Sequence, residues 1–255
     1  MSEVRIPVVL RKIRSLIFHI RNAVMRRVYA VRVRRAEALL REKGIIDLLL
    51  DGREGEFSPQ FYDLYNLYVT VRRRRPQRVI EFRIGFSTLV LLRALHDNYV
   101  EDKKENFEQA EKRRGRLWSV EDSEEWIENT RNKIPDYLQV YSTICHSEIS
   151  IQVIDGELCH TYDKLPNITP ELIYLDGAVN VKGTVNGLSF DEGGKTRGVV
   201  AADILLYEST LRPGAYVIVD KRYNNVFFLK RRLKRKYIVH GFDYVTHLTS
   251  FELFE

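Results

Sequence analysis

The sequence predicts an α/β fold in which helices cover a mostly parallel central sheet, preceded by a basic helical extension. Three observations lead to this expectation. Four short apolar runs, each of a length suited to a buried strand, end in an acidic residue. Helix-like stretches separate these runs, which is the alternation from which parallel sheets are built. Two further strand-like runs close the chain.

The first 35 residues carry most of the positive charge. They hold nine Arg and one Lys against one Glu, a charge of +9, whereas the whole chain is at +6 and the remainder is therefore at −3. Apolar residues recur every three or four positions between the arginines, a pattern typical of a helix with one apolar stripe in a basic surround. Such a helix could lie on an anionic membrane surface, dock on its own domain, or pair with a second copy. Arginines interrupt every apolar run too early for a transmembrane span.

A helix is predicted over residues 58–71, SPQFYDLYNLYVTV, because the sequence starts with a Ser-Pro cap signal. Tyr62, Tyr65 and Tyr68 recur at helical spacing, which favours a packing face over stacking groups for nucleic acid. The basic run Arg72–Arg75 is interpreted as a solvated helix end, where positive charge is favourable. Nucleic acid is therefore not the favoured partner.

The most informative stretch is Arg78–Leu95, RVIEFRIGFSTLVLLRAL. A short strand closes with Glu81, a tight turn contains Gly85, and Ser87 with Thr88 can cap the helix that follows. Open α/β sheets build nucleotide-cofactor pockets in this way, because the strand end and the helix N-terminus present backbone N–H groups to one bound molecule. We therefore expect a cofactor at this turn.

Three further strands are predicted at the same edge of the sheet. The run Arg116–Glu121, RLWSVE, precedes an amphipathic helix at 122–135, and the carboxylate of Glu121 would lie beside the first turn. There it could accept both hydroxyls of a ribose. The runs at 171–177, ELIYLDG, and 214–220, GAYVIVD, also end in acids. Four terminal carboxylates thus mark the carboxyl end of the sheet as its functional edge.

The remaining segments have simpler predicted roles. They are a solvated charged helix at 101–115, a strand and then a hairpin turned at Asp155-Gly156 within 144–162, a mobile substrate loop or lid at 177–198, a helix at 199–211, and the closing strands at 234–240 and 244–254 joined around Gly241-Phe242.

The ordered segments ExxxGFSTLVLLRAL, LWSVEDSEEW, LIYLDG and LRPGAYVIVD resemble the motifs of class I S-adenosylmethionine-dependent methyltransferases over residues 57–255. The resemblance implies a Rossmann-like domain at 51–255, whose sheet is finished by a C-terminal antiparallel strand pair, behind an extension at 1–50. It implies S-adenosyl-L-methionine as cofactor and methyl transfer to an oxygen or nitrogen of a small-molecule or glycan-like acceptor. It also implies residue roles: Glu81, Gly85 and Ser87 would line the methionine side, Glu121 the ribose and His146 the adenine, and Asp176 would be the general base at the reaction centre.

One position departs from the family pattern. Relatives usually read E-x-G-x-G-x-S at the first turn, whereas Arg83 replaces the first glycine here. Glycine permits φ > 0 and close approach of the backbone to a ligand, and arginine offers neither without strain. Either Arg83 turns away and the cofactor-binding pocket survives, or the pocket is degenerate and the chain is a non-catalytic binding or scaffold protein.

A metal ion is not expected. Asp176 and Asp220, with Asn224 and Asn225 nearby, could supply oxygen ligands for Mg²⁺. Metal-dependent small-molecule O-methyltransferases have an Asn directly after the second acid, however, whereas Lys221 stands there in this chain.

The cysteines also carry no chemistry in this interpretation. Cys145 and Cys159 lack the paired spacing of a zinc site and form no disulfide framework. His146 and His160 each follow a cysteine but lie in the strand and hairpin segment, so no zinc is implied. A reduced, cytoplasmic location is the simplest inference, peripheral to a membrane if the first helix binds one.

Overall fold

The computed structural model describes residue 24 and residues 27–50, 59–176, 199–220, 223–240 and 248–255, together with the backbone of four two-residue strands, β7 (Thr184–Val185), β8 (Leu188–Ser189), β9 (Asp191–Glu192) and β10 (Lys195–Thr196). The start of the basic segment, Ser58, most of the predicted lid at 177–198, Lys221 and the turn at Gly241-Phe242 lie outside the described residues.

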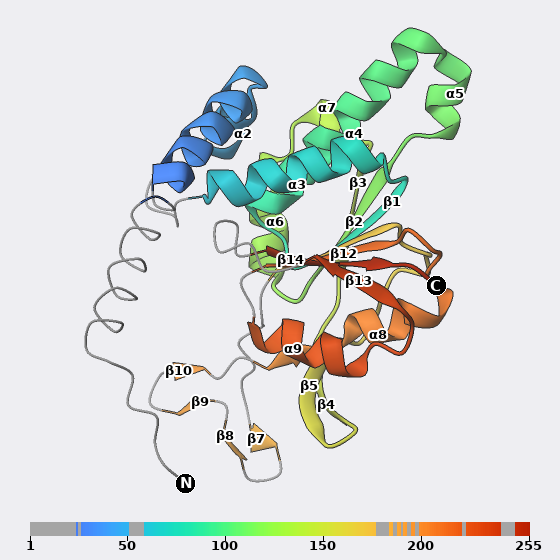
Figure 1. The fold of residues 1–255 in the computed structure, drawn as a ribbon. Helices are drawn as coiled ribbons and strands as arrows, with labels where there is room; N and C mark the ends of the chain where they lie inside the picture. Colours follow the sequence, from blue (N-terminus) through green and yellow to red (C-terminus); the bar gives the residue numbers. More distant parts are fainter. Residues whose placement is uncertain are drawn as a thin grey trace, which may run out of the picture.

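A seven-stranded sheet forms the centre of the molecule, in the order β13-β14-β12-β6-β1-β2-β3 (Figure 1). Five strands are parallel, and β14 runs antiparallel to both β12 and β13. Their bounds are β1 Arg78–Phe82, β2 Arg116–Glu121, β3 Ser142–His146, β6 Leu172–Asp176, β12 Tyr216–Asp220, β13 Tyr237–His240 and β14 Leu248–Leu253. The predicted Rossmann-like fold with a closing antiparallel pair is confirmed.

Helices cover both faces of this sheet, which is why its central strands are almost continuously apolar (Figure 1). Helices α3 (Phe61–Arg74) and α4 (Phe86–Glu105) pack on one face, and α8 (Asp203–Tyr207) and α9 (Tyr223–Arg232) on the other. Successive β1 residues alternate between the two cores, with Val79 on the α4 side and Ile80 on the α8 side. The α6 (Glu124–Lys133) and α7 (Asp136–Gln139) helices connect β2 to β3.

The second half of the N-terminal extension belongs to the core. Residues 27–42 are helical, the helix ends in a turn at Gly44 with φ +65°, and α2 (Ile45–Leu50) follows. Leu40, Ile45 and Leu49 are fully buried in the same apolar cluster as α3 and α4. Removing this part would therefore expose core surface.

The hairpin turn is confirmed at the predicted residues. Strands β4 (Ile149–Ile154) and β5 (Glu157–Tyr162) pair antiparallel across Asp155 and Gly156, which have φ values of +48° and +80°. Two left-handed residues in a two-residue loop give the turn that matches strand twist. The predicted helix at 199–211 is wrong at its start, because β11 (Val200–Ala201) pairs with β5 and only then do α8 and a 3₁₀ turn at Glu208–Thr210 follow.

The charged segment 101–115 is not the single helix that the sequence predicts, but is divided between two. Helix α4 continues through Glu105, and Asn106 then caps a short α5 (Phe107–Lys112) by accepting a hydrogen bond from the Gln109 backbone N–H.

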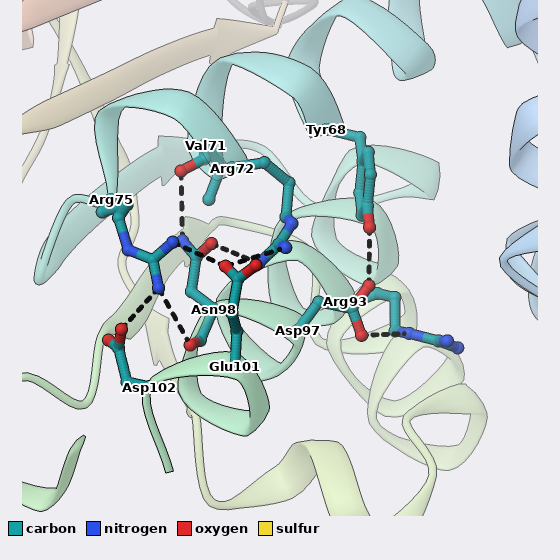
Figure 2. Close-up of polar contacts among 9 residues, drawn as sticks. All are labelled: Tyr68, Val71, Arg72, Arg75, Arg93, Asp97, Asn98, Glu101 and Asp102. Atoms are coloured by element: carbon teal, nitrogen blue, oxygen red, sulfur yellow. Dashed lines mark hydrogen bonds and ion pairs between the residues drawn. The ribbon is translucent and has the colours of Figure 1, made fainter. Parts of the chain in front are cut away.

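The run Arg72–Arg75 ends α3, as predicted, but it is not simply solvated, because Arg72, Arg74 and Arg75 form ion pairs with other described residues. Arg72 and Arg75 reach Glu101 on α4 at 3.2 and 2.7 Å, while Arg74 pairs with Glu252 on β14 at 2.8 Å. Figure 2 shows the Arg72 and Arg75 side chains converging on Glu101 and Asp102. Each such partly exposed pair contributes about 0.2–1 kcal/mol. The run thus joins α3 to α4 and to the end of the sheet.

Gly115, just before β2, gives a stability prediction. A Cβ added there would lie 2.6 Å from Leu95 Cδ2 and 2.8 Å from the Pro76 carbonyl oxygen, and that backbone atom cannot easily move. We expect Gly115→Ala to lower the free energy of unfolding by about 1–3 kcal/mol, measured by urea denaturation. Gly85→Ala is the control: its φ of 171° is ordinary extended backbone and, chain neighbours apart, no described atom lies within 4 Å of its added Cβ, so only the small cost of an alanine N-cap, below about 1 kcal/mol, is expected.

Candidate functional site

The carboxylate of Glu121 lies on the turn between β1 and α4. Glu121 ends β2, which lies next to β1, and its side chain is almost fully buried. It accepts a hydrogen bond from the Ile84 backbone N–H at 3.1 Å, and from those of Asp122 and Ser123 at 3.1 Å each. Burial, and secondarily the neighbouring Asp122 carboxyl, raises the pKa of Glu121. The residue predicted from the second strand thus meets the first turn.

Glu81 lies on the same turn, from β1. Its side chain is fully buried, and it accepts hydrogen bonds from the hydroxyls of Ser87 at 3.0 Å and Ser119 at 2.6 Å. Burial raises the pKa of Glu81 to about 7, against the lowering effect of these hydroxyls. The strand closes one residue later than predicted, at Phe82. Two acids from neighbouring strands therefore flank one turn, and the pKa of each carboxyl is raised toward neutral pH.

The start of α4 differs slightly from the prediction. Gly85 is the N-cap residue, and the Thr88 hydroxyl accepts a hydrogen bond from the Gly85 backbone N–H at 3.0 Å. Ser87 lies in the first turn but points to Glu81 instead of capping the helix. No atom lies within 4 Å of where a Gly85 Cβ would stand, so this part of the turn leaves room for an incoming group. The helix behind it has 20 residues, and the positive end of its dipole at this N-terminus favours an anion.

Arg83 adopts the backbone conformation that explains a glycine at this position. Its φ is +73°, in the left-handed region, which costs an L-residue about 1–2 kcal/mol. The Arg83 N–H is held by the Val120 carbonyl oxygen at 2.9 Å. Arg83 is half-buried and makes no ion pair with any residue of the described ranges. Its positive charge lowers the pKa values of His160 and Tyr162, as the smallest of the effects that shift those two pKa values. The side chain is thus retained at the turn at a conformational cost.

His146 and Asp176 reach the same edge of the sheet. His146 ends β3 and is exposed, and its Nε2 lies 3.1 Å from the carbonyl oxygen of Asp122, just past Glu121. Asp176 ends β6 on the other side of β1, is half-buried, and its charge contributes to raising the pKa of Glu81. All predicted site residues therefore belong to one edge.

The possible oxygen ligands for a metal, Asp176, Asp220, Asn224 and Asn225, all lie within the described residues. Asp176 and Asp220 are register partners at the ends of β6 and β12, and the Tyr174 hydroxyl donates to Asp220 at 3.4 Å. Asn225 is buried on α9. Within the described ranges, no three His, Cys, Asp or Glu side chains are grouped as metal ligands would be.

Several residues near the candidate site were not predicted from the sequence. Ser119, in the middle of β2, hydrogen-bonds Glu81, and Tyr162 from β5 stacks on Phe82 with 5.9 Å between ring centroids. Buried Asp203 accepts from the Tyr162 backbone N–H at 2.7 Å, and burial raises the pKa of Asp203 to about 7. A serine within an otherwise apolar strand was the one available signal. The hairpin therefore closes over the end of β1.

His160 is a structural residue of the hairpin. It is almost fully buried, and its Nδ1 lies 3.0 Å from the Val199 carbonyl oxygen. Burial lowers the pKa of His160 to about 4, so the ring is neutral at physiological pH.

Comparisons with known proteins agree at the level of fold. Neither a protein-family model nor a curated protein matches the sequence. Solved structures that resemble the chain include a methyltransferase of Podospora anserina with bound S-adenosylhomocysteine (11% identity, TM-score 0.43, covering 78% of this chain and 80% of that chain). They also include the O-methyltransferase TomG of Streptomyces achromogenes, involved in tomaymycin synthesis, in complex with S-adenosylmethionine (16%, 0.42, 88% and 90%). A third is an O-methyltransferase of Bacillus cereus in complex with S-adenosylhomocysteine (13%, 0.40, 85% and 90%).

These likenesses are distant, and the assignment rests on the strand order and register of the chain itself. By that order, with β14 antiparallel between β12 and β13, the chain has the fold of class I S-adenosylmethionine-dependent methyltransferases.

Proposed function

We propose that this chain catalyses S-adenosylmethionine-dependent methyl transfer to an oxygen or nitrogen of a small-molecule or glycan-like acceptor. The observation that carries the proposal is the meeting of Glu81 and Glu121 on one turn, with Glu121 accepting the Ile84 N–H and Ser87 joining Glu81 to the first turn of α4. An acid-lined edge suits a cofactor with a sulfonium and an ammonium group. The glycan-like acceptor rests on the sequence resemblance alone.

The residues of the turn fit the cofactor in chemistry. Glu81, Gly85 and Ser87 would hold the methionine part, with the open space at Gly85 and the helix N-terminus suited to its carboxylate. Glu121 would hold the ribose, and His146, one strand further, would lie by the adenine. Three of the roughly four lone-pair directions of the Glu121 carboxylate already accept backbone N–H groups. Binding both ribose hydroxyls would therefore require at least one of these hydrogen bonds to be exchanged.

The chain's own chemical task in this mechanism is small. The cofactor supplies an already activated methyl group, so the protein mainly positions the acceptor and excludes water. Asp176, half-buried at the end of β6, would act as general base and take the proton of the acceptor hydroxyl or amine. Asp176 lies across β1 from Glu121, which supports a base on the side away from a ribose held by Glu121.

Arg83 supports a second candidate function, a non-catalytic binding or scaffold protein with a degenerate cofactor pocket. The observation that favours it is a guanidinium kept on the turn in a left-handed conformation, where a glycine would avoid the strain and leave space.

The two functions are separated by ligand binding to the full chain and to Arg83→Gly. We expect both proteins to bind S-adenosylmethionine and S-adenosylhomocysteine in calorimetry and to be stabilised by them in thermal shift. Without ligand, Arg83→Gly should be more stable by about 0.5–1 kcal/mol. The substitution relieves the strain at φ +73°, and this gain exceeds the stability that is lost because glycine gives the unfolded chain more conformational freedom. If only Arg83→Gly binds, the scaffold function is correct; if neither binds, the methyltransferase proposal is wrong.

A further inference from the structure

The helix of residues 27–42 presents two different faces. One is anchored: Tyr29 packs edge-to-face on Tyr62 of α3 with 6.2 Å between ring centroids, and Ala36 and Leu40 are buried in the core. In Figure 1 this helix and α2 lie at one corner of the molecule, outside α3 and α4. The opposite face is therefore free to meet something other than the sheet domain.

That opposite face is apolar and uncovered. Val24, Val28 and Val31 are spaced four and three residues apart and are 54%, 37% and 65% exposed. At about 100° per residue they fall within an arc of about 60°, about 130° from the direction of Ala36 and Leu40. Among the described residues these three exposed valines form one stripe, which we call the outer face, and an exposed apolar stripe is typical of an interaction surface.

The charge around the three valines is positive. Arg27, Arg34 and Arg35 are exposed around the three valines, and within the described part of the chain they form no ion pair. No Asp or Glu occurs between Glu3 and Glu37, a stretch with nine Arg and one Lys. A second copy of this face would bring like charges together, which disfavours self-pairing. The partner must therefore be anionic and able to accept apolar side chains.

We propose that the outer face binds the surface of an anionic lipid bilayer, with the helix lying in the plane of the interface. The arginines are attracted to the anionic headgroups, and the valines enter the boundary between headgroups and acyl chains. Among the described residues no helix has the length and apolar content needed to cross a membrane. The Tyr29–Tyr62 contact, with Ala36 and Leu40, would then hold the sheet domain beside the bilayer.

Vesicle co-sedimentation of the full chain tests this proposal. Vesicles of phosphatidylcholine with about one third phosphatidylserine should bind the protein at least 10-fold more strongly than pure phosphatidylcholine vesicles, and 0.5 M salt should abolish the difference. Two variants should each weaken binding at least 10-fold: Arg27→Glu/Arg34→Glu/Arg35→Glu, which reverses the charges, and Val28→Ser/Val31→Ser, which removes apolar surface.

The matched control is Arg113→Glu/Arg116→Glu/Arg131→Glu, which changes net charge equally at exposed positions elsewhere. It should retain binding. Equal loss in this control and in the helix variant would show a net-charge effect and overturn the proposal, as would equal binding to neutral vesicles or no binding at all. Sedimentation velocity gives the remaining outcome: a dimer that Val28→Ser/Val31→Ser dissolves would assign the outer face to a second copy. S-adenosylmethionine binding should be unchanged in all of these variants, so failure here leaves the proposed function untouched.

Discussion

Replacing Glu121 by glutamine is expected to weaken S-adenosylmethionine binding by about 10- to 100-fold. The ribose hydroxyls would lose a charged acceptor, and hydrogen bonds to charged groups contribute about 1.5–3 kcal/mol. Glutamine keeps one oxygen to accept either the Ile84 N–H or those of Asp122 and Ser123, so the turn should still fold. Calorimetry with S-adenosylmethionine and S-adenosylhomocysteine measures the loss, and both ligands should suffer equally because they share the ribose.

The pH dependence adds an independent readout. Burial raises the pKa of Glu121 above its usual range, so wild-type affinity should increase from pH 6 to pH 8 as this carboxyl ionises. Glu121→Gln should lose that part of the increase.

Glu208→Gln is the control for the Glu121 substitution. Glu208 is also a buried glutamate that accepts two backbone N–H groups, from Lys234 and Arg235, but it lies in the 3₁₀ turn that precedes β12. Its substitution should leave cofactor affinity unchanged. Wild-type affinity in Glu121→Gln, with an unchanged melting temperature, would remove Glu121 from the site.

The parts of the fold that follow from local patterns could be predicted. An apolar run buried on both faces and closed by an acid indicated β1, β2, β6 and β12, and the Asp155-Gly156 pair indicated its hairpin because a two-residue turn is decided locally. Strand β11 could not be found in this way. Val200 and Ala201 have helical surroundings in the sequence and become a strand only by pairing with Cys159 and His160, forty residues upstream.

The site was predictable to the same extent. Glu81 and Glu121 end or nearly end strands, and their shared edge follows from the parallel sheet. Ser119 could not be assigned, because a serine in a strand becomes meaningful only when its partner on the next strand is known. The arginines at the end of α3 were correctly predicted as a helix end, but their ion pairs were missed for the same reason: the partners Glu101 and Glu252 lie far along the chain. Contacts between distant segments are thus the main information that local pattern lacks.

Glu81→Gln is expected to stabilise the protein at pH 8 by about 1–3 kcal/mol while weakening S-adenosylmethionine binding by about 10-fold or more. Glu81 is fully buried, and burial raises its pKa from an ordinary 4.5 to about 7. As pH rises from about 4.5 to about 7, the unfolded chain releases this proton while the folded chain keeps it, so the free energy of unfolding falls. Above about pH 7 that loss is complete. Glutamine cannot ionise, and the hydroxyls of Ser87 and Ser119 can rotate to suit its amide.

Urea unfolding at pH 5, 6, 7 and 8 isolates this effect, because subtracting wild type from Glu81→Gln cancels every other titrating group. The stability difference should increase from pH 5 to about pH 7 and then level off. Asp203→Asn is the control for the principle: it is also fully buried with a pKa raised to about 7, so it should show the same trend in stability. A stability difference for Glu81→Gln that does not change with pH would mean that folding does not raise the pKa of this carboxyl. A stabilised variant with weakened cofactor binding would instead show that the acid is kept at the turn for its ligand, at a cost to the fold.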